Sequence, residues 1–111
     1  MYLARFSYDI KPIDREHALG LLSREVAAAR QQGLEARLLI PLTRAPSGGA
    51  LQVEVLVPTL DRFETFREVG LGSSEETRAW MRELSQVLLE PPAVELLRVA
   101  ETETESIDEE T

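Results

Sequence analysis

The chain has 111 residues, enough for one domain with a hydrophobic core and too few for two such domains. Hydrophobic residues make up 43% of it and charged residues 29%, a balance typical of soluble globular domains. The net charge of −8 disfavours nucleic-acid backbones and anionic membrane surfaces as partners, because both would repel the chain.

The acidity is concentrated at the C-terminal end. The segment from Glu101 to Thr111 contains six acidic residues and no basic one, so the rest of the chain is close to −2. We expect residues 1–101 to form a single domain and residues 102–111 to form an acidic tail without fixed structure. The chain starts with a strand pattern and has no apolar run long enough to span a membrane, so we expect a cytoplasmic protein.

The first two predicted elements are a strand and a long helix. Apolar and polar residues alternate over Tyr2–Lys11, which predicts a half-buried strand. Asp14 is a suitable helix N-cap, and an apolar stripe at three- and four-residue spacing predicts a helix over about 15–32. Gly33 is a natural end for it.

Two further strands follow, joined by a loop. Residues Leu34–Thr43 alternate again, but Pro41 places this strand at an edge of the sheet, because proline cannot donate to a central ladder. The Pro-, Ser- and Gly-containing run over 43–50 predicts a hairpin loop. The strand over Leu51–Val57 is rich in β-branched residues and should end at Pro58.

Two helices and a strand complete the pattern. Apolar spacing predicts a short helix or turn over about 60–69. Ser73 with Glu76 forms a capping-box pattern before a second long helix to about Glu90, where two prolines end it. Residues Val94–Ala100 then predict the last strand.

The order of these elements predicts an α+β fold, a ferredoxin-like βαββαβ sandwich with both long helices on one face of an antiparallel sheet. The expected strand order is 4-1-3-2, with the first and third strands central. The β-branched third strand and the proline-bearing second strand agree with this order.

The third strand Val53–Pro58 runs directly into Thr59–Glu68, and a helix bearing Trp80 follows. In this the chain resembles the dimeric α+β barrel superfamily, which includes NIPSNAP-type proteins, antibiotic-biosynthesis monooxygenases and heme-degrading monooxygenases. The resemblance covers about residues 2–100. It implies a homodimer whose sheets pack face to face, and a ligand cavity between sheet and helices in each subunit.

Alternation also predicts which residues lie on the sheet face away from the helices. This face should carry leucines among charged side chains, a mixture that suits an interface with ion pairs more than a surface bathed in water. The expected interface residues are Leu3, Arg5, Arg37, Leu39, Glu54, Leu56 and Arg98. A solvated face with chance leucines is the alternative.

The aromatic side chains and the single histidine are the candidates for a pocket. A lone histidine, with no cysteine, excludes a multi-histidine or thiolate metal site, so we expect neither a metal nor a cofactor. The heme ligand that the resemblance implies is a histidine on the second long helix, and this chain has none there. The candidate pocket residues are Tyr8, His17, Phe63, Phe66 and Trp80; each is also compatible with a purely structural role.

Two functions remain open at this stage. The first is a homodimer that binds an apolar or aromatic small molecule between sheet and helices, for which the resemblance allows monooxygenase-like activity without a cofactor. The second is a non-enzymatic interaction or regulatory module that acts through its dimer and acidic tail. The sequence alone does not decide whether the protein is an enzyme.

Overall fold

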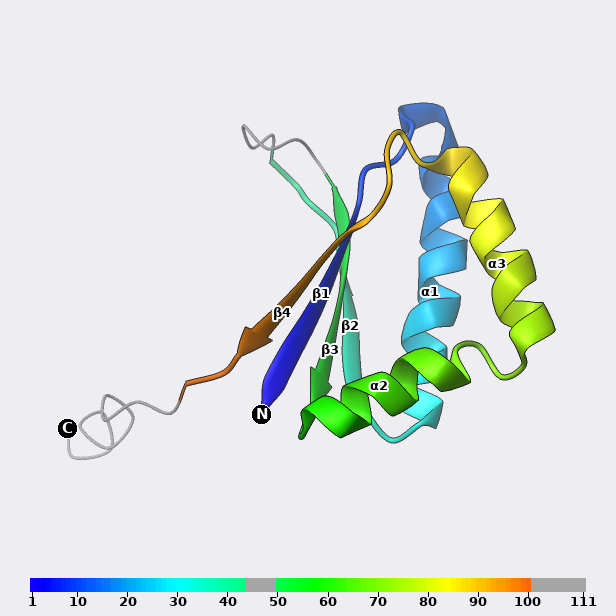
Figure 1. Ribbon diagram of the computed structural model, residues 1–111. Helices are drawn as coiled ribbons and strands as arrows, with labels where there is room; N and C mark the ends of the chain where they lie inside the picture. The colour runs from blue at the N-terminus through cyan, green and yellow to red at the C-terminus, as the bar shows by residue number, and fades with distance from the viewer. Residues whose placement is uncertain (44–49, 101–111) are drawn as a thin grey trace.

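The computed structural model describes residues 1–43 and 50–100, which form one antiparallel four-stranded sheet with its helices on one face (Figure 1). The elements in chain order are β1 (Tyr2–Tyr8), the 3-10 turn η1 (Pro12–Asp14), α1 (Arg15–Gln31), β2 (Glu35–Leu39), β3 (Leu51–Val57), α2 (Leu60–Val69), α3 (Ser74–Val87) and β4 (Ala93–Arg98). The strand order β2-β3-β1-β4 is the predicted 4-1-3-2 read from the other edge. The α+β ferredoxin-like fold is therefore confirmed.

Three strands end where local chemistry stops them. β2 ends at Leu39, before Pro41, and lies at an edge as predicted; β3 ends at Val57, before Pro58. β1 ends at Tyr8, earlier than predicted, because the chain turns there into η1. Its continuation pairs only locally, through an isolated bridge between Ile10 and Leu88.

The helix ends follow the capping rules. Gly33 has φ +81° just beyond α1, a backbone conformation that glycine adopts without strain. The Ser73 hydroxyl accepts the backbone N–H of Glu76 at 3.1 Å and begins α3 as the capping box predicts. α3 ends at Val87, before the predicted Glu90, because the Leu89 N–H already donates to Asp9 O at 2.8 Å.

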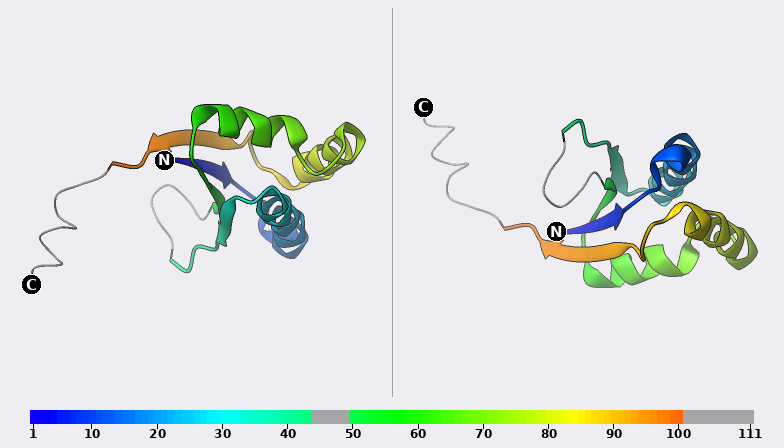
Figure 2. Two further views of the ribbon diagram at one scale, coloured as in Figure 1. Left: turned by 90° about the horizontal axis from the view of Figure 1, so that it is seen from below. Right: turned by 90° about the horizontal axis from the view of Figure 1, so that it is seen from above.

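The core lies between the sheet and the helices. The residues of β1 and β3 that face the helices are almost fully buried: Ala4, Phe6, Tyr8, Leu51, Val53, Val55 and Val57. α1 packs on β2 and β3, and α3 packs on α1, while α2 crosses the end of the sheet where β1 starts and β3 ends (Figures 1 and 2). Half of the sheet is thus covered directly by α1, and β4 lies beyond it with all of its residues exposed.

Two predictions fall on residues outside this description. Most of the predicted hairpin loop over 43–50 and all of the predicted tail over 102–111 belong to residues that the structure does not describe. Within residues 1–43 and 50–100, no helix is long and apolar enough to cross a membrane.

Candidate functional site

The helix-covered side of the sheet contains a cavity of about 320 Å³. Its floor comes from β1 and β4, one wall from α1, and the remaining walls from α2 and α3. The apolar lining residues are Phe6, Ala28, Phe66, Leu71, Trp80, Met81, Leu84, Leu88, Pro92 and Val94. Met81 and Val94 are 58% and 47% exposed, so the cavity opens to solvent between α3 and β4.

The cavity exists because α3 is held by α1 and not by the sheet. Trp80 of α3 is buried, and its indole Nε1–H donates to Leu21 O of α1 at 2.7 Å. This bond fixes α3 beside α1, above the half of the sheet that α1 leaves uncovered. The space between α3 and strands β1 and β4 therefore stays open.

Polar residues interrupt this apolar lining: Arg67 of α2, Thr77 and Ser85 of α3, and one hydrogen-bonded pair. The Tyr8 hydroxyl, at the end of β1, donates to both carboxylate oxygens of Glu25 on α1, at 2.9 and 3.0 Å. Tyr8 is 3% exposed, and Glu25 is the only carboxyl among the described residues that line the cavity. The pair thus joins sheet to helix at the cavity wall.

Burial changes the proton affinity of both partners. It raises the pKa of Glu25 to about 7, and the hydrogen bond from Tyr8 opposes this rise only in part. Burial and the adjacent carboxylate also raise the pKa of Tyr8, so its phenol stays protonated. Glu25 can therefore accept or release a proton near neutral pH, as a general acid or base must.

The predicted pocket residues divide into two groups. Tyr8, Phe66 and Trp80 line the cavity, and the Phe66 ring lies 6.5 Å from that of Phe6. Phe63 is buried in the core, under the Arg67 guanidinium at 5.7 Å, and does not line the cavity. The structure therefore brings three of the five candidates together.

His17 lies away from the cavity. It is on the exposed side of α1, where its Nε2 is 3.4 Å from the carboxylate of Glu83 on α3. Both side chains are more than half exposed, so this contact joins the two helices at the surface. His17 is thus removed from the candidate pocket.

The prediction missed Glu25, although the sequence contains a signal for it. Glu25 lies three residues after Leu22 and four before Ala29, two members of the buried stripe of α1. An acidic residue at such a position faces the core side of its helix and needs a partner there. The spacing therefore identifies a half-buried carboxyl, but it does not identify Tyr8 as the partner.

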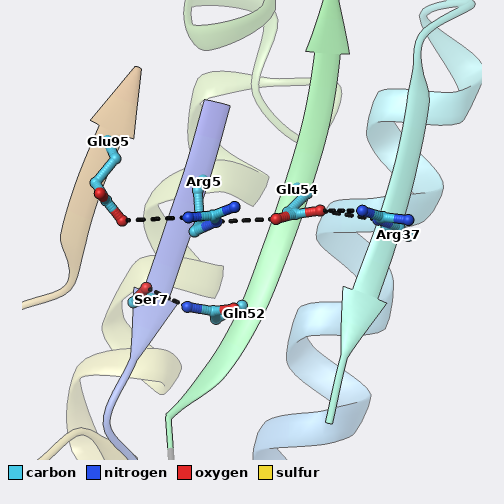
Figure 3. A network of polar contacts seen from close by, with 6 residues as sticks. All are labelled: Arg5, Ser7, Arg37, Gln52, Glu54 and Glu95. Carbon is cyan, nitrogen blue, oxygen red and sulfur yellow. Dashed lines mark hydrogen bonds and ion pairs between the residues drawn. The ribbon is translucent and has the colours of Figure 1, made fainter. Parts of the chain in front are cut away.

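The opposite face of the sheet carries a row of alternating charges across all four strands (Figure 3). Arg5 of β1 donates to Glu54 of β3 at 2.8 Å, and Arg37 of β2 donates to the other Glu54 oxygen at 2.8 Å. A guanidinium nitrogen of Arg5 also lies 3.9 Å from Glu95 of β4. Below this row, Gln52 donates to the Ser7 hydroxyl at 3.2 Å. We call this row of Glu95, Arg5, Glu54 and Arg37 the charge ladder.

Glu54 is the buried member of the charge ladder. Only 3% of it is exposed, because the two arginine side chains cover it on the surface of the sheet. Burial alone would raise the pKa of Glu54, but the hydrogen bonds and charges of Arg37 and Arg5 outweigh it and hold the pKa below its usual range.

The placement of Arg98 was wrong. The register of β4 pairs Arg98 with Tyr2, which puts it on the helix side of the sheet, while Glu95 and Leu97 lie on the open face. Both faces of this strand mix apolar and charged residues, so alternation does not tell which face is which. The other six predicted interface residues share the open face, as expected from the register.

Comparison with known proteins supports the architecture. No family model matches the chain, and no curated protein matches it either. Among solved structures, the chain is similar to a NIPSNAP domain protein from Burkholderia xenovorans, with 15% identity over 90% of this chain and 95% of that one, at a TM-score of 0.69. A putative antibiotic biosynthesis monooxygenase from Nitrosomonas europaea is 12% identical over 91% and 100% of the two chains, at a TM-score of 0.68.

These similarities confirm the predicted ferredoxin-like fold, which the chain shares with NIPSNAP domain and antibiotic biosynthesis monooxygenase-like structures. A dimeric ferredoxin-like protein of unknown function from Thermobifida fusca is also similar, with 15% identity over 89% of this chain and 92% of that one, at a TM-score of 0.61. At such identities the likeness shows how the chain folds, and the function has to be argued from its own residues.

Proposed function

We propose that this protein is a cytoplasmic homodimer that binds an apolar or aromatic small molecule in the cavity between sheet and helices. The cavity of about 320 Å³ carries this proposal. That volume lies at the small end of ordinary ligand sites, which combine apolar walls with a few convergent polar groups. Here the aromatic rings of Phe66 and Trp80 supply flat walls, and the Tyr8–Glu25 pair and Arg67 supply polar groups.

Glu25 defines what the polar end of the ligand should be. The only proton of the Tyr8 hydroxyl is already donated to Glu25, so an ionised Glu25 offers the ligand acceptor oxygens and no donor. A ligand hydroxyl or amine donating to that carboxylate would relieve part of its desolvation cost. At the Glu25 side of the cavity we therefore expect the apolar body to carry one hydrogen-bond donor, while Arg67, which also lines the cavity, can donate to a ligand acceptor.

The binding test uses 1-naphthol, an aromatic ring system with one hydroxyl. Trp80 is the only tryptophan in the chain and lines the cavity, so its indole N–H resonance reports occupancy. We expect 1-naphthol to shift this resonance saturably. The methyl ether 1-methoxynaphthalene, which cannot donate to Glu25, should bind about tenfold more weakly, since a hydrogen bond to a charged group contributes about 1.5 kcal/mol or more.

Two alanines on consecutive positions of α1 provide the control. Ala28→Phe fills the cavity and should abolish the shift, while Ala27→Phe places the same ring on the exposed side of the helix and should leave it. Absence of saturable binding, or equal binding by the two variants, would remove the ligand site and leave the interaction-module alternative.

For activity, we propose cofactor-independent, monooxygenase-like oxidation of the bound molecule. The similarity to a putative antibiotic biosynthesis monooxygenase from Nitrosomonas europaea supports this chemistry, and Glu25 supplies a base near neutral pH. A methylene flanked by an aromatic ring and a carbonyl would lose a proton to Glu25. Oxidation by O2 would then convert the CH2 to C=O with release of one water, and the substrate itself would supply all the electrons.

The test compound for this activity is 2-tetralone, which has such a methylene and whose enol carries a hydroxyl that can donate to the Glu25 carboxylate. Oxygen uptake should require both the compound and the protein, and Glu25→Gln should reduce it at least tenfold, within the usual range for loss of a general base. If oxygen uptake with the protein is no faster than without it, the proposed oxidation is excluded. The binding proposal would still be tested separately with 1-naphthol.

The homodimer rests on the open face of the sheet. Leu3, Leu39 and Leu56 lie there half-buried among the charges, and the Thermobifida fusca neighbour is described as dimeric. Sedimentation equilibrium should give twice the chain mass; a monomer at micromolar concentration would contradict this part of the proposal.

A further inference from the structure

The polar side chains that line the cavity differ in whether their protons are free for a ligand. The Tyr8 hydroxyl has one proton, which it donates to Glu25 on α1. The Trp80 indole also has one N–H proton, which it donates to Leu21 O at 2.7 Å. Neither side chain therefore has a proton left to donate to a ligand.

The two hydroxyls of α3 that line the cavity are occupied in the same way. Thr77 donates to Ser73 O and Ser85 donates to Arg82 O, each at 2.8 Å. Among the described residues that line the cavity, Arg67 of α2 is thus the side-chain donor with protons to spare. An acceptor on a ligand would have to turn toward it.

Arg67 is held in place without using its N–H groups. Its guanidinium lies 5.7 Å from the centre of the Phe63 ring, an attractive cation–π contact that occupies no proton. Within residues 1–43 and 50–100, its side chain forms no ion pair and donates no hydrogen bond. The guanidinium therefore offers the cavity a positive charge and several donors.

The charge of Arg67 also reaches the Tyr8–Glu25 pair. Burial and the Glu25 carboxylate raise the pKa of Tyr8, while the positive charge of Arg67 opposes this rise. Such an effect requires the guanidinium to lie near the hydroxyl that donates to Glu25. The cavity thus has a carboxylate from α1 and a cation from α2 around the same space.

A carboxylate and a free guanidinium match the two changes in a ketone that loses a proton from the carbon beside its carbonyl. The carboxylate takes the proton, and the electron pair of the broken C–H bond forms a C=C bond as the carbonyl oxygen becomes an enolate oxygen. Negative charge thus leaves the carboxylate and arrives at an oxygen that the guanidinium stabilises. Return of the proton to carbon restores the ketone, so the cycle consumes no oxidant or reductant.

We propose that Arg67 binds the carbonyl oxygen of an aromatic ketone while Glu25 removes a proton from the adjacent carbon, so that the cavity catalyses enolisation without oxygen. This inference rests on the proposed ligand site and adds a proton-transfer activity that needs no O2. It also specifies the substrate class, in which a methylene joins an aromatic ring to a carbonyl group. Phe66 and Trp80 supply the walls for that ring.

Deuterium exchange into 2-tetralone under nitrogen tests the proposal. In D2O the methylene between the ring and the carbonyl exchanges its protons, and proton NMR follows the loss of its signal. The wild-type protein should accelerate this exchange over buffer, and the acceleration should rise with pH about a midpoint near 7, where Glu25 ionises. Glu25→Gln should reduce the acceleration by about tenfold or more, within the usual range for loss of a general base.

Substitutions of Arg67 test the second half of the proposal. Arg67→Met keeps an apolar stem beside Phe63 but removes the charge, and it should reduce the acceleration by about tenfold or more, because losing one oxyanion donor commonly costs about 100-fold in rate. Arg67→Lys keeps a cation and should retain more exchange than Arg67→Met. Arg78→Met changes an exposed arginine of α3 outside the cavity lining and should leave the exchange unchanged.

The possible failures are distinguishable. Exchange no faster than in buffer would overturn the enolisation, and equal rates for the wild type and Arg67→Met, or for Arg67→Lys and Arg67→Met, would overturn the role of Arg67. Exchange under nitrogen without oxygen uptake in air would support the enolisation and exclude only the oxidation. Absence of saturable 1-naphthol binding would remove the ligand site on which both activities rest.

Discussion

Two carboxyls on opposite sides of the sheet, Glu25 half-buried and Glu54 buried, have pKa values shifted in opposite directions. Glu25, on the helix side, has one neutral partner in the Tyr8 hydroxyl, and burial raises its pKa to about 7. Glu54, on the open face, has two arginine partners, which hold its pKa below the usual range. Burial acts in the same direction on both, so the partners decide the outcome.

The difference separates a carboxylate that stays ionised from one that can change charge near neutral pH. Each oxygen of the Glu54 carboxylate accepts a hydrogen bond from an arginine side chain, so Glu54 remains ionised across the physiological range. The Glu25 carboxylate lines an open cavity and can accept further hydrogen bonds besides the one from Tyr8. It also changes charge near neutral pH. A perturbed carboxyl with spare hydrogen-bonding capacity in a cavity is the pattern expected of a functional group.

The largest loss of stability is expected when both arginine partners of Glu54 are removed. Arg5→Met with Arg37→Met leaves a carboxylate without its two guanidinium groups, and we expect a loss of about 2–4 kcal/mol in the free energy of unfolding. Urea denaturation at pH 7 measures it. Arg98→Met is the matched control, because Arg98 is exposed on the other face. Equal stability of the double variant and the control would show that the charge ladder is dispensable.

Neutralising Glu25 should raise the stability of the protein, whereas removing the arginine partners of Glu54 should lower it. Its folded-state pKa is raised above the ordinary value of 4.5, so the folded state binds the proton more tightly and stability falls as pH rises from about 4.5 to 7. Glu25→Gln should remove this slope and stabilise the protein by up to about 3 kcal/mol at pH 8. Thermal unfolding across this pH range measures it, with Glu83→Gln as the exposed control. An unchanged slope would contradict the raised pKa.

A smaller effect is expected at the contact that holds α3 away from the sheet. Trp80→Phe removes the hydrogen bond to Leu21 O and part of the ring, and should cost about 1–2 kcal/mol. Because α3 would also lose one of the contacts that hold it to α1, binding of 1-naphthol should weaken along with stability. Calorimetric titration measures the binding, and unchanged affinity would mean that this bond does not shape the cavity.

The smallest effect should be at His17. It is 54% exposed and its only charged partner among the described residues is Glu83, so His17→Gln should change stability by less than about 0.5 kcal/mol. It should also leave 1-naphthol binding unchanged, because the imidazole lies outside the cavity. Weaker binding in this variant would restore His17 as a pocket residue.

Sequence periodicity was sufficient for the fold because the alternating strands have one clearly apolar face each. Pro41 identified the edge strand, and Ser73 with Glu76 identified the start of α3. β4 was the exception. It is an uncovered edge strand without a clearly apolar face, so alternation could not tell which of its residues face the helices, and Arg98 was assigned to the wrong side.

The candidate site was predictable only in part, because it depends on a tertiary arrangement. Tyr8, Phe66 and Trp80 were found because aromatic side chains stand out in the sequence. Glu25 was missed because its importance comes from a partner seventeen residues away on another element. The cavity itself follows from α3 packing on α1, which no local pattern encodes.

The most direct test of the proposed ligand site is the titration of the Glu25 carboxyl, followed by carbon-13 NMR with and without 1-naphthol. The free protein should show a midpoint near 7 for Glu25. Saturating 1-naphthol should lower it, since a hydroxyl donating to the carboxylate favours the ionised form. A midpoint near the ordinary 4.5 that 1-naphthol does not move would contradict a ligand site built around Glu25.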